Sequence, residues 1–205
     1  MLILLGWALG LLSPAVVEGI RRRRDSTAVR DALLSELRDL RYRVALASFR
    51  ACSTYGDIDR EYLVWLEAVL RSCPEIKADN SVLRLIEEHL ALDDKAFKEF
   101  VRMSKEENPA LGLKKYAVPL LDARLQSLWH LPLSFQRGLL AVRTHLNLLN
   151  EEIDQSRYYF GLTFTIDGDN HKRVVENFVG AQRNFAVQAK RIINEIQKLV
   201  PSDAG

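Results

Sequence analysis

The sequence predicts an all-α protein, in which an N-terminal single-pass membrane helix precedes an antiparallel helical bundle with a long C-terminal helical hairpin. Three observations carry this prediction. An uncharged apolar run is followed by four arginines, apolar residues recur at helical spacing along the remaining chain, and the last third alternates spacings of four and three residues. We therefore divide the 205 residues into a membrane anchor at 1–24, a cytoplasmic bundle at 25–200 and a disordered tail at 201–205.

The N-terminal segment is predicted to be the membrane anchor because sixteen residues from Leu2 to Val17 carry no charge. Basic residues follow this run instead of preceding it, which argues against a cleaved signal peptide and keeps the following chain in the cytoplasm. The same arginines are candidates for contact with lipid headgroups. The predicted anchor side chains are Leu2, Ile3, Leu4, Leu5, Trp7, Leu9, Leu11, Leu12, Val16 and Val17, and the basic cluster is Arg21, Arg22, Arg23 and Arg24.

Two alternatives to a spanning helix stay open. Ser13 followed by Pro14 resembles an N-cap with proline at the first helical position, so the segment is also compatible with a re-entrant or in-plane anchor. A buried core helix would explain the apolar run but leaves the arginines unexplained. Hydropathy and the position of the arginines favour the span. The expected localisation is therefore the inner membrane, with a single pass, the N-terminus outside and the C-terminal domain in the cytoplasm.

Residues 25–130 are expected to form one long helix and several short ones. Apolar residues from Val29 to Phe49 follow helical spacing and predict an amphipathic helix over about 27–52. The region 53–130 is divided into short helices by turn and helix-breaking residues, and its last helix is expected over about 118–130. The dividing segments are Tyr55-Gly56-Asp57, Pro74 and Glu107-Asn108-Pro109.

The region 133–200 carries the strictest pattern of the chain. Two long helices, over about 133–164 and 170–200, are predicted to pack as an antiparallel hairpin, since the turn between them is short. The helix at 27–52 is expected to be the third member of this bundle. The apolar positions that define the pattern are Phe135, Leu139, Val142, Leu146, Leu149 and Ile153 in the first helix and Phe178, Ala181, Phe185, Ala189, Ile192, Ile196 and Leu199 in the second.

Composition argues against several classes of function. Lysine and arginine total 29 against 27 acidic residues, and a net charge of +2 does not favour binding to nucleic acid. The four histidines lack the paired spacing of zinc and di-iron sites, so we expect neither a metal nor another cofactor. Cys52 and Cys73 are interpreted as buried thiols of a reducing compartment. No catalytic or nucleotide-binding motif occurs in the sequence.

Aromatic residues supply the remaining candidates. Trp65, Trp129 and His130 are candidates to line a pocket among the short helices, because ligand pockets combine apolar walls with a few polar groups. A second aromatic group, which we interpret as packing at the end of the hairpin, consists of Tyr158, Tyr159, Phe160 and Phe164.

These features predict a non-enzymatic interaction or scaffold protein at the cytoplasmic face of the membrane. Its expected partners are membrane lipids and either another protein or further copies of the same chain. A first alternative is a hydrophobic-ligand-binding or enzymatic helical domain with a pocket among the short helices. A second is an oligomerising membrane-active effector, for which Gly6 and Gly10 form a Gly-x-x-x-Gly pattern.

Overall fold

A computed structural model describes the backbone of residues 2–73, 81–105 and 112–200, and the side chains of these ranges from residue 24 onward. All regular secondary structure in the described residues is helical. The elements are α1 (Leu2–Tyr55), α2 (Arg60–Arg71), α3 (Ser81–Leu90), α4 (Asp94–Ser104), α5 (Pro119–Arg124), the 3-10 helix η2 (Leu125–His130), α6 (Leu133–Leu162) and α7 (Asp169–Leu199). The predicted all-α class is confirmed.

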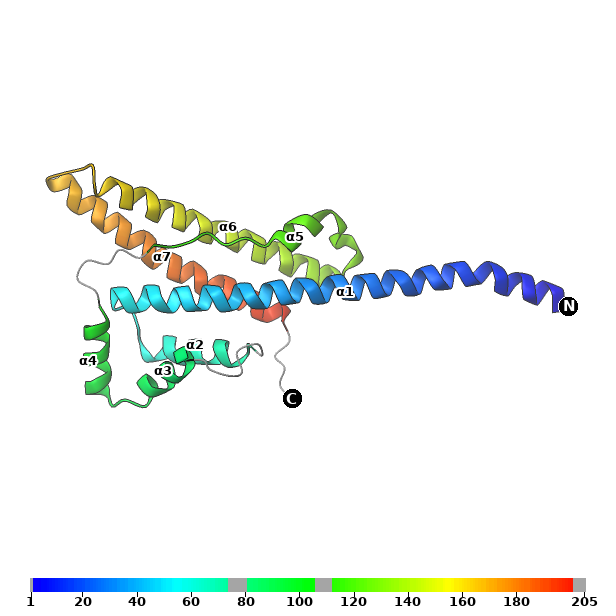
Figure 1. Ribbon diagram of the computed structural model, residues 1–205, viewed down its shortest axis with the longest axis horizontal. Coiled ribbons are helices and arrows are strands. Elements are labelled where there is room, and N and C mark those ends of the chain that lie inside the picture. Colours follow the sequence, from blue (N-terminus) through cyan, green and yellow to red (C-terminus); the bar gives the residue numbers. More distant parts are fainter. Residues whose placement is uncertain (1, 74–80, 106–111, 201–205) are drawn as a thin grey trace.

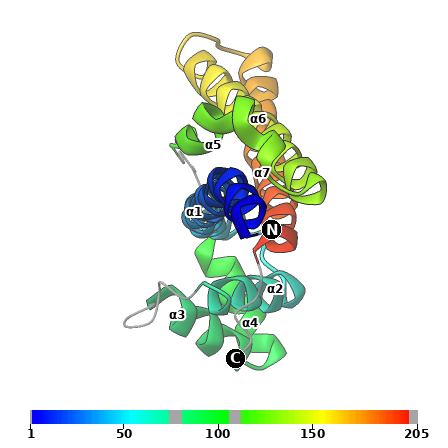
Figure 2. The same ribbon diagram turned by 90° about the vertical axis from the view of Figure 1, so that its right-hand side faces the viewer.

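The long helix α1 lies between two groups of helices (Figures 1 and 2). The α6–α7 hairpin packs along one side of α1, and α7 contacts both α6 and α1. The short helices α2, α3 and α4 lie on the opposite side (Figure 2). The far end of the hairpin extends past the C-terminal end of α1, and among the described helices α6 and α7 pack against each other there (Figure 1).

The C-terminal end of α1 is fixed by a Schellman motif. The Gly56 N–H donates to the Ser53 carbonyl at 3.1 Å, and the Asp57 N–H donates to the Cys52 carbonyl at 2.8 Å. Gly56 has φ of 71°, in the left-handed region that glycine adopts without steric cost. The predicted turn at Tyr55-Gly56-Asp57 is therefore confirmed, and it sends the chain back towards α2.

The predicted apolar stripe of α1 forms the centre of the core. Leu33, Leu37, Leu40 and Val44 are fully buried, with α7 as the principal neighbour. Arg41 is also buried, and its guanidinium donates to the Ser72 carbonyl at 2.8 Å, at the end of α2. A cation at this position offsets the partial negative charge of the helix C-terminus. The third-helix prediction is confirmed for the part of α1 inside the bundle.

The hairpin is the element that the sequence predicts best. The six predicted core positions of α6 are all buried, and six of the seven predicted positions of α7 are buried, with Leu199 only partly covered. The bounds of α6 and α7 lie within two residues of the predicted ones. The alternation of four and three residues therefore does place a continuous apolar seam along both helices.

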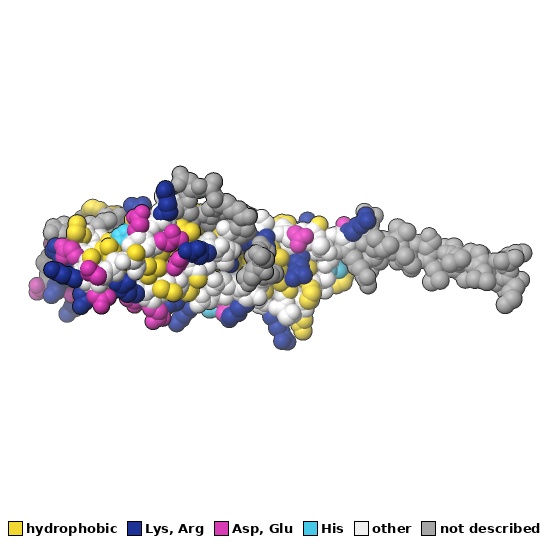
Figure 3. Space-filling model, turned by 90° about the horizontal axis from the view of Figure 1, so that it is seen from below, with side chains coloured by type: hydrophobic (Ala, Val, Ile, Leu, Met, Phe, Trp, Pro, Cys, Tyr) yellow, Lys and Arg dark blue, Asp and Glu magenta, His cyan; other side chains and the backbone are white. Residues whose placement is uncertain are grey.

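Two of the short helices, α2 and α4, begin at aspartate caps. The Asp59 carboxylate accepts a hydrogen bond from the Tyr62 N–H at 2.6 Å and starts α2, and the Asp93 carboxylate accepts one from the Ala96 N–H at 2.8 Å and starts α4. Lysine and arginine are interspersed with acidic side chains on the face that this group presents (Figure 3). That face shows a mixed-sign surface of the kind that helical bundles expose to solvent.

The predicted localisation as a single-pass inner-membrane protein is wrong. Over the part of the chain that the structure describes, no helix combines the length and the apolar character that crossing a membrane requires. A span takes about 20 predominantly apolar residues. The uncharged run has sixteen, and α1 continues from it without a break through Glu18 and the arginines into the charged bundle helix.

Most of the predicted anchor lies outside the side chains that the structure describes. This holds for the ten apolar anchor positions and for Arg21, Arg22 and Arg23, whereas Arg24 is described and is exposed. The predicted tail at 201–205 also lies outside the described residues. The division of the chain at residue 24 stays a prediction.

Candidate functional site

The segment before α6 differs from the single helix predicted over 118–130. The structure has the short α-helix α5 followed by η2, and both lie against α1 and α6 (Figure 1). Pro119 occupies the first position of α5, and Val118 supplies no side-chain cap. The cap comes instead from Glu36 of α1, whose two carboxylate oxygens accept hydrogen bonds from the Leu120 and Leu121 N–H groups at 2.8 and 2.9 Å.

The chain that leads into α5 is also held by distant side chains. The Asn150 side chain of α6 accepts a hydrogen bond from the Tyr116 N–H at 3.0 Å and donates one to the Tyr116 carbonyl at 2.9 Å. Arg157 donates to the Leu113 carbonyl at 3.0 Å. These bonds replace the secondary-structure partners that residues 112–118 lack, and they fix where α5 and η2 begin.

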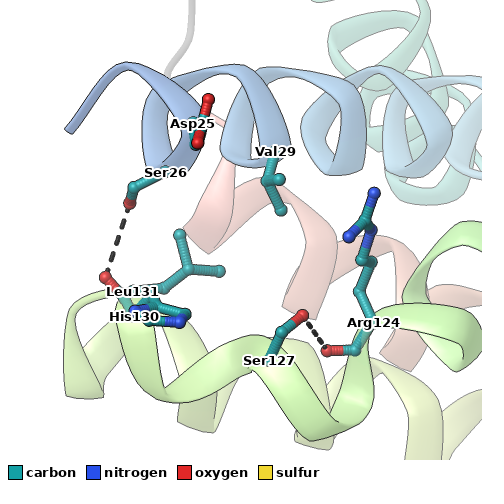
Figure 4. Close-up of a pocket in the computed structure, with 7 residues that line it drawn as sticks. All are labelled: Asp25, Ser26, Val29, Arg124, Ser127, His130 and Leu131. Atoms are coloured by element: carbon teal, nitrogen blue, oxygen red, sulfur yellow. Dashed lines mark hydrogen bonds between the residues drawn. The ribbon is translucent and has the colours of Figure 1, made fainter. Parts of the chain in front are cut away.

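A small cleft lies where α1 passes α5 and η2 (Figure 4). Its volume is about 220 Å³. The Ser26 hydroxyl donates to the His130 carbonyl at 3.4 Å, and the Ser127 hydroxyl donates to the Arg124 carbonyl at 3.0 Å. The lining residues are Asp25, Ser26, Val29, Arg124, Ser127, His130 and Leu131.

The cleft offers a carboxylate, a guanidinium and an imidazole, but it does not assemble them into a catalytic set. Within the described residues, no hydrogen bond joins the His130 imidazole to Asp25 or to either hydroxyl, and all three charged or titratable side chains are exposed. Its volume also falls below the roughly 300 Å³ at which small-ligand pockets begin. The cleft can hold a small polar molecule, and nothing in its geometry activates a nucleophile.

The structure does not bring the three predicted pocket residues together. His130 lines the cleft, and Trp129 stacks on it with ring centroids 3.3 Å apart while remaining 69% exposed. Trp65 lies on α2, where its indole N–H donates to the Asn194 side chain of α7 at 3.1 Å. A ligand role for these residues stays a prediction.

The far end of the hairpin carries the most exposed aromatic surface described. Phe160 and Phe164 meet edge to face with ring centroids 5.1 Å apart, and Phe160 also packs against the buried ring of Phe178 at 5.6 Å. Phe164 is 75% exposed and Phe160 is 39% exposed. Val175, one turn before Phe178, is exposed as well. We call Phe160, Phe164 and Val175 the tip surface.

The tip surface is exposed because the hairpin outruns its neighbours. Past the end of α1, α6 and α7 form a two-helix unit that can bury side chains only along a single seam (Figure 1). Tyr158 lies two residues before Phe160, hence on the other side of α6, and is 63% exposed. The aromatic residues at the hairpin end do pack in pairs, Tyr158 with Tyr159 and Phe160 with Phe164, but Tyr158 and Phe164 stay largely exposed.

A polar cluster is buried where α1 and α2 meet. The Ser48 and Tyr62 hydroxyls are hydrogen bonded at 2.9 Å, and the Cys52 side chain lies beside them. Burial raises the pKa of the Cys52 thiol to about 11, from 9.0, and burial likewise raises the pKa of the Tyr62 phenol. Both groups are neutral at physiological pH, so Cys52 is a packed thiol and no nucleophile. The interpretation of Cys52 and Cys73 as buried, unpaired thiols is confirmed.

Metal ligands do not converge in the described ranges, where no group of three or more His, Cys, Asp or Glu side chains is arranged to hold an ion. Comparison of the chain with protein-family models, with curated proteins and with solved structures found no match.

Sequence reasoning missed most of the residues that shape these sites. Asp25 lines the same cleft as Arg124 and His130, although about a hundred residues of chain separate it from them, and no local sequence pattern predicts that they lie in one cleft. Phe164 did carry a signal, because an aromatic residue beside a turn has little helix surface on which to pack. The same signal applies to Val175 only after the end of α1 is known.

Proposed function

We propose that this protein is a helical interaction module that binds another protein through the tip surface. The observation that carries the proposal is the exposure of Phe160, Phe164 and Val175 at the end of the hairpin. Adjacent exposed apolar side chains mark interaction sites, and aromatic residues supply much of the binding energy at protein interfaces.

The geometry of the hairpin supports this role. The two phenylalanine rings hold each other edge to face, and Phe160 rests on the buried ring of Phe178. Part of the side-chain freedom that binding would otherwise remove is thus already lost in the free protein. The tip also lies clear of α1, so a partner can approach it without displacing other helices (Figure 1).

Site-specific photo-cross-linking tests the proposal. Phe164 is replaced by p-benzoyl-phenylalanine in the full chain, which is irradiated in cells that express it naturally, and Tyr158 is replaced in the matched control. Both positions are exposed and aromatic, and they lie on different sides of the hairpin end. We expect a protein adduct of defined mass from position 164 and none from position 158. An adduct at twice the chain mass of 23.4 kDa would identify the partner as a second copy.

Affinity measurements with the captured partner complete the test. Phe164→Ser is expected to weaken binding about thirtyfold, which corresponds to an interface residue worth roughly 2 kcal/mol. Tyr158→Ser should leave the affinity unchanged. Absence of an adduct at position 164, equal adducts at both positions, or equal affinities for both serine variants would each refute the proposal. Because Phe164 is so exposed, its replacement should not disturb folding.

A further inference from the structure

A second site, separate from the tip surface, lies between α7 and α2. Both helices contact α1, and between them, over the C-terminal end of α1, is a groove of about 310 Å³. This volume falls at the lower end of the range for small-molecule sites, roughly 300–1,000 Å³. The floor comes from Ala51, Cys52 and Tyr55 near the end of α1, and Ala186 and Val187 form the α7 wall.

The groove is apolar because its side chains are small or internally satisfied. Alanines at positions 51 and 186 leave open space above the buried Cys52 thiol, which is neutral. The Tyr62 hydroxyl is already hydrogen bonded to Ser48 and therefore adds little polarity. Val187 is 51% exposed on a helix whose outer face is otherwise mainly polar. An apolar guest would cover this valine.

The two ends of the groove differ in charge. Arg183 and Lys190 lie two turns apart on α7, about 10 Å along the helix axis. Arg183 is neutralised by Asp57, with contacts of 2.7 and 3.1 Å between guanidinium nitrogens and carboxylate oxygens. Lys190 has no carboxylate within ion-pair distance among the described residues, and its ammonium lies 5.3 Å from the centre of the Trp65 ring.

The Trp65 ring that holds Lys190 is itself fixed. Its indole N–H donates to the Asn194 side chain, and its ring contacts the Tyr62 ring with centroids 5.5 Å apart. The cation–π contact keeps the ammonium at one end of the groove without satisfying its charge by a carboxylate. The apolar walls, the neutralised end and the positively charged end together match a molecule with an apolar chain and one anionic group.

We propose that this groove binds a small amphipathic carboxylate, with the carboxylate at Lys190 and the apolar chain over Ala186 and Val187 towards the Arg183–Asp57 pair. The charge-assisted contact with Lys190 sets the orientation, and burial of the chain supplies the remaining affinity. This site does not depend on the tip surface, so either proposal can fail without the other.

Calorimetric titration of the full chain with octanoate tests the inference. We expect saturable binding with one site per chain, and about tenfold weaker binding of octanol, which has the same chain without the charge. Lys190→Met keeps the apolar stem of the side chain and should also weaken octanoate binding about tenfold. Lys198→Met, on the same helix but at a 68% exposed side chain paired with Glu195, is the matched control and should bind like the wild type.

Tryptophan fluorescence locates the site. In a Trp7→Phe/Trp129→Phe background, Trp65 is the one remaining tryptophan of the three, and its emission should change along the same binding curve. Lack of saturable binding, equal affinities for octanoate and octanol, or equal effects of the two methionine substitutions would overturn the proposal. If octanoate fails to bind and Val187→Asp dissociates a dimer in analytical ultracentrifugation, the groove belongs to a second copy and the ligand proposal is wrong.

Discussion

Glu36 caps the start of α5, although it lies 84 residues before Leu120, whose N–H donates to its carboxylate. Its carboxylate is half-buried and accepts both hydrogen bonds at the start of α5. Glu36→Ala removes both acceptors, so that the Leu120 and Leu121 N–H groups can be hydrogen bonded only by water. Glu36→Gln keeps one acceptor oxygen and loses the charge that favours the positive end of the helix.

The size of the effect follows from the two bonds. Loss of a helix cap costs about 0.5–2 kcal/mol, and a single hydrogen bond to a charged group contributes about 1.5–3 kcal/mol. Solvent reaches part of this site, so the two contributions do not add in full. We expect Glu36→Ala to lower the free energy of unfolding by about 2 kcal/mol, and Glu36→Gln to lower it by about 1 kcal/mol.

Urea unfolding of the full chain measures these changes. The matched control is Asp39→Ala, which removes an exposed carboxylate of the same helix from its pair with Arg43 and should cost no more than about 0.5 kcal/mol. Hydrogen exchange at the Leu120 and Leu121 amides locates the effect. If Glu36→Ala costs no more than the control, or if the two amides keep their protection, Glu36 does not cap α5.

Three further predictions concern stability. As the pH rises from 9 to 11, the folded state retains the Cys52 proton that the unfolded thiol releases, so the free energy of unfolding should fall by about 2–3 kcal/mol. Urea titrations at several pH values measure this fall, which should be smaller in Cys52→Ala. Gly180→Ala has open space around the new methyl group and should raise the thermal midpoint, because alanine favours the helix by about 0.5–1 kcal/mol. Gly138→Ala instead places a carbon 2.3 Å from a Leu199 methyl, so the free energy of unfolding of this variant should be at least about 1 kcal/mol lower than that of Gly180→Ala. Asn150→Ala frees one backbone N–H and one carbonyl and should cost about 1–3 kcal/mol in urea unfolding; a loss below about 0.5 kcal/mol would contradict its anchoring role.

The sequence predicts an element well where local spacing determines its burial. The hairpin is the clear case, because each turn of α6 and α7 meets the same neighbouring helix and a repeated pattern is enough. The starts of α2 and α4 are also set locally, since an aspartate cap acts within its own first turn.

Prediction fails where the partner is distant in sequence. One helix is predicted over 118–130, but the structure has α5 and η2 there, with the start of α5 fixed by the Glu36 cap and the preceding chain held by Asn150. In α3, Ile86 alone is fully buried among the described residues, and Leu85 is 39% exposed although it is apolar. That helix packs against α2 and α4, and Ile86 is its one fully buried contribution to the hydrophobic core among the described residues.

The candidate sites were hard to predict for the same physical reason. Trp65 and Trp129 are both tryptophans among the short helices, but Trp65 is positioned by a hydrogen bond to α7, whereas Trp129 lies within η2. An exposed Phe164 cannot be told from a packed one until the end of α1 is located, because the length of α1 decides how far the hairpin stands alone. The exposure of the tip surface thus depends on the length of α1 as well as on the length of the hairpin.

The helix α7 connects the two proposed sites. Phe178, under the tip surface, and Arg183, at the neutral end of the groove, are five residues apart, about 7.5 Å along the helix axis. Between them Ala181 and Gln182 are buried, so this stretch of α7 is held on its inner side and keeps the two sites at a fixed separation. Because a packed helix moves as a unit, a partner at the tip and a ligand in the groove can influence each other only by shifting α7 against α1 and α6. The close approach of Gly138 to Leu199 opposes that shift at the other end of the hairpin, which makes independent binding at the two sites the expected behaviour.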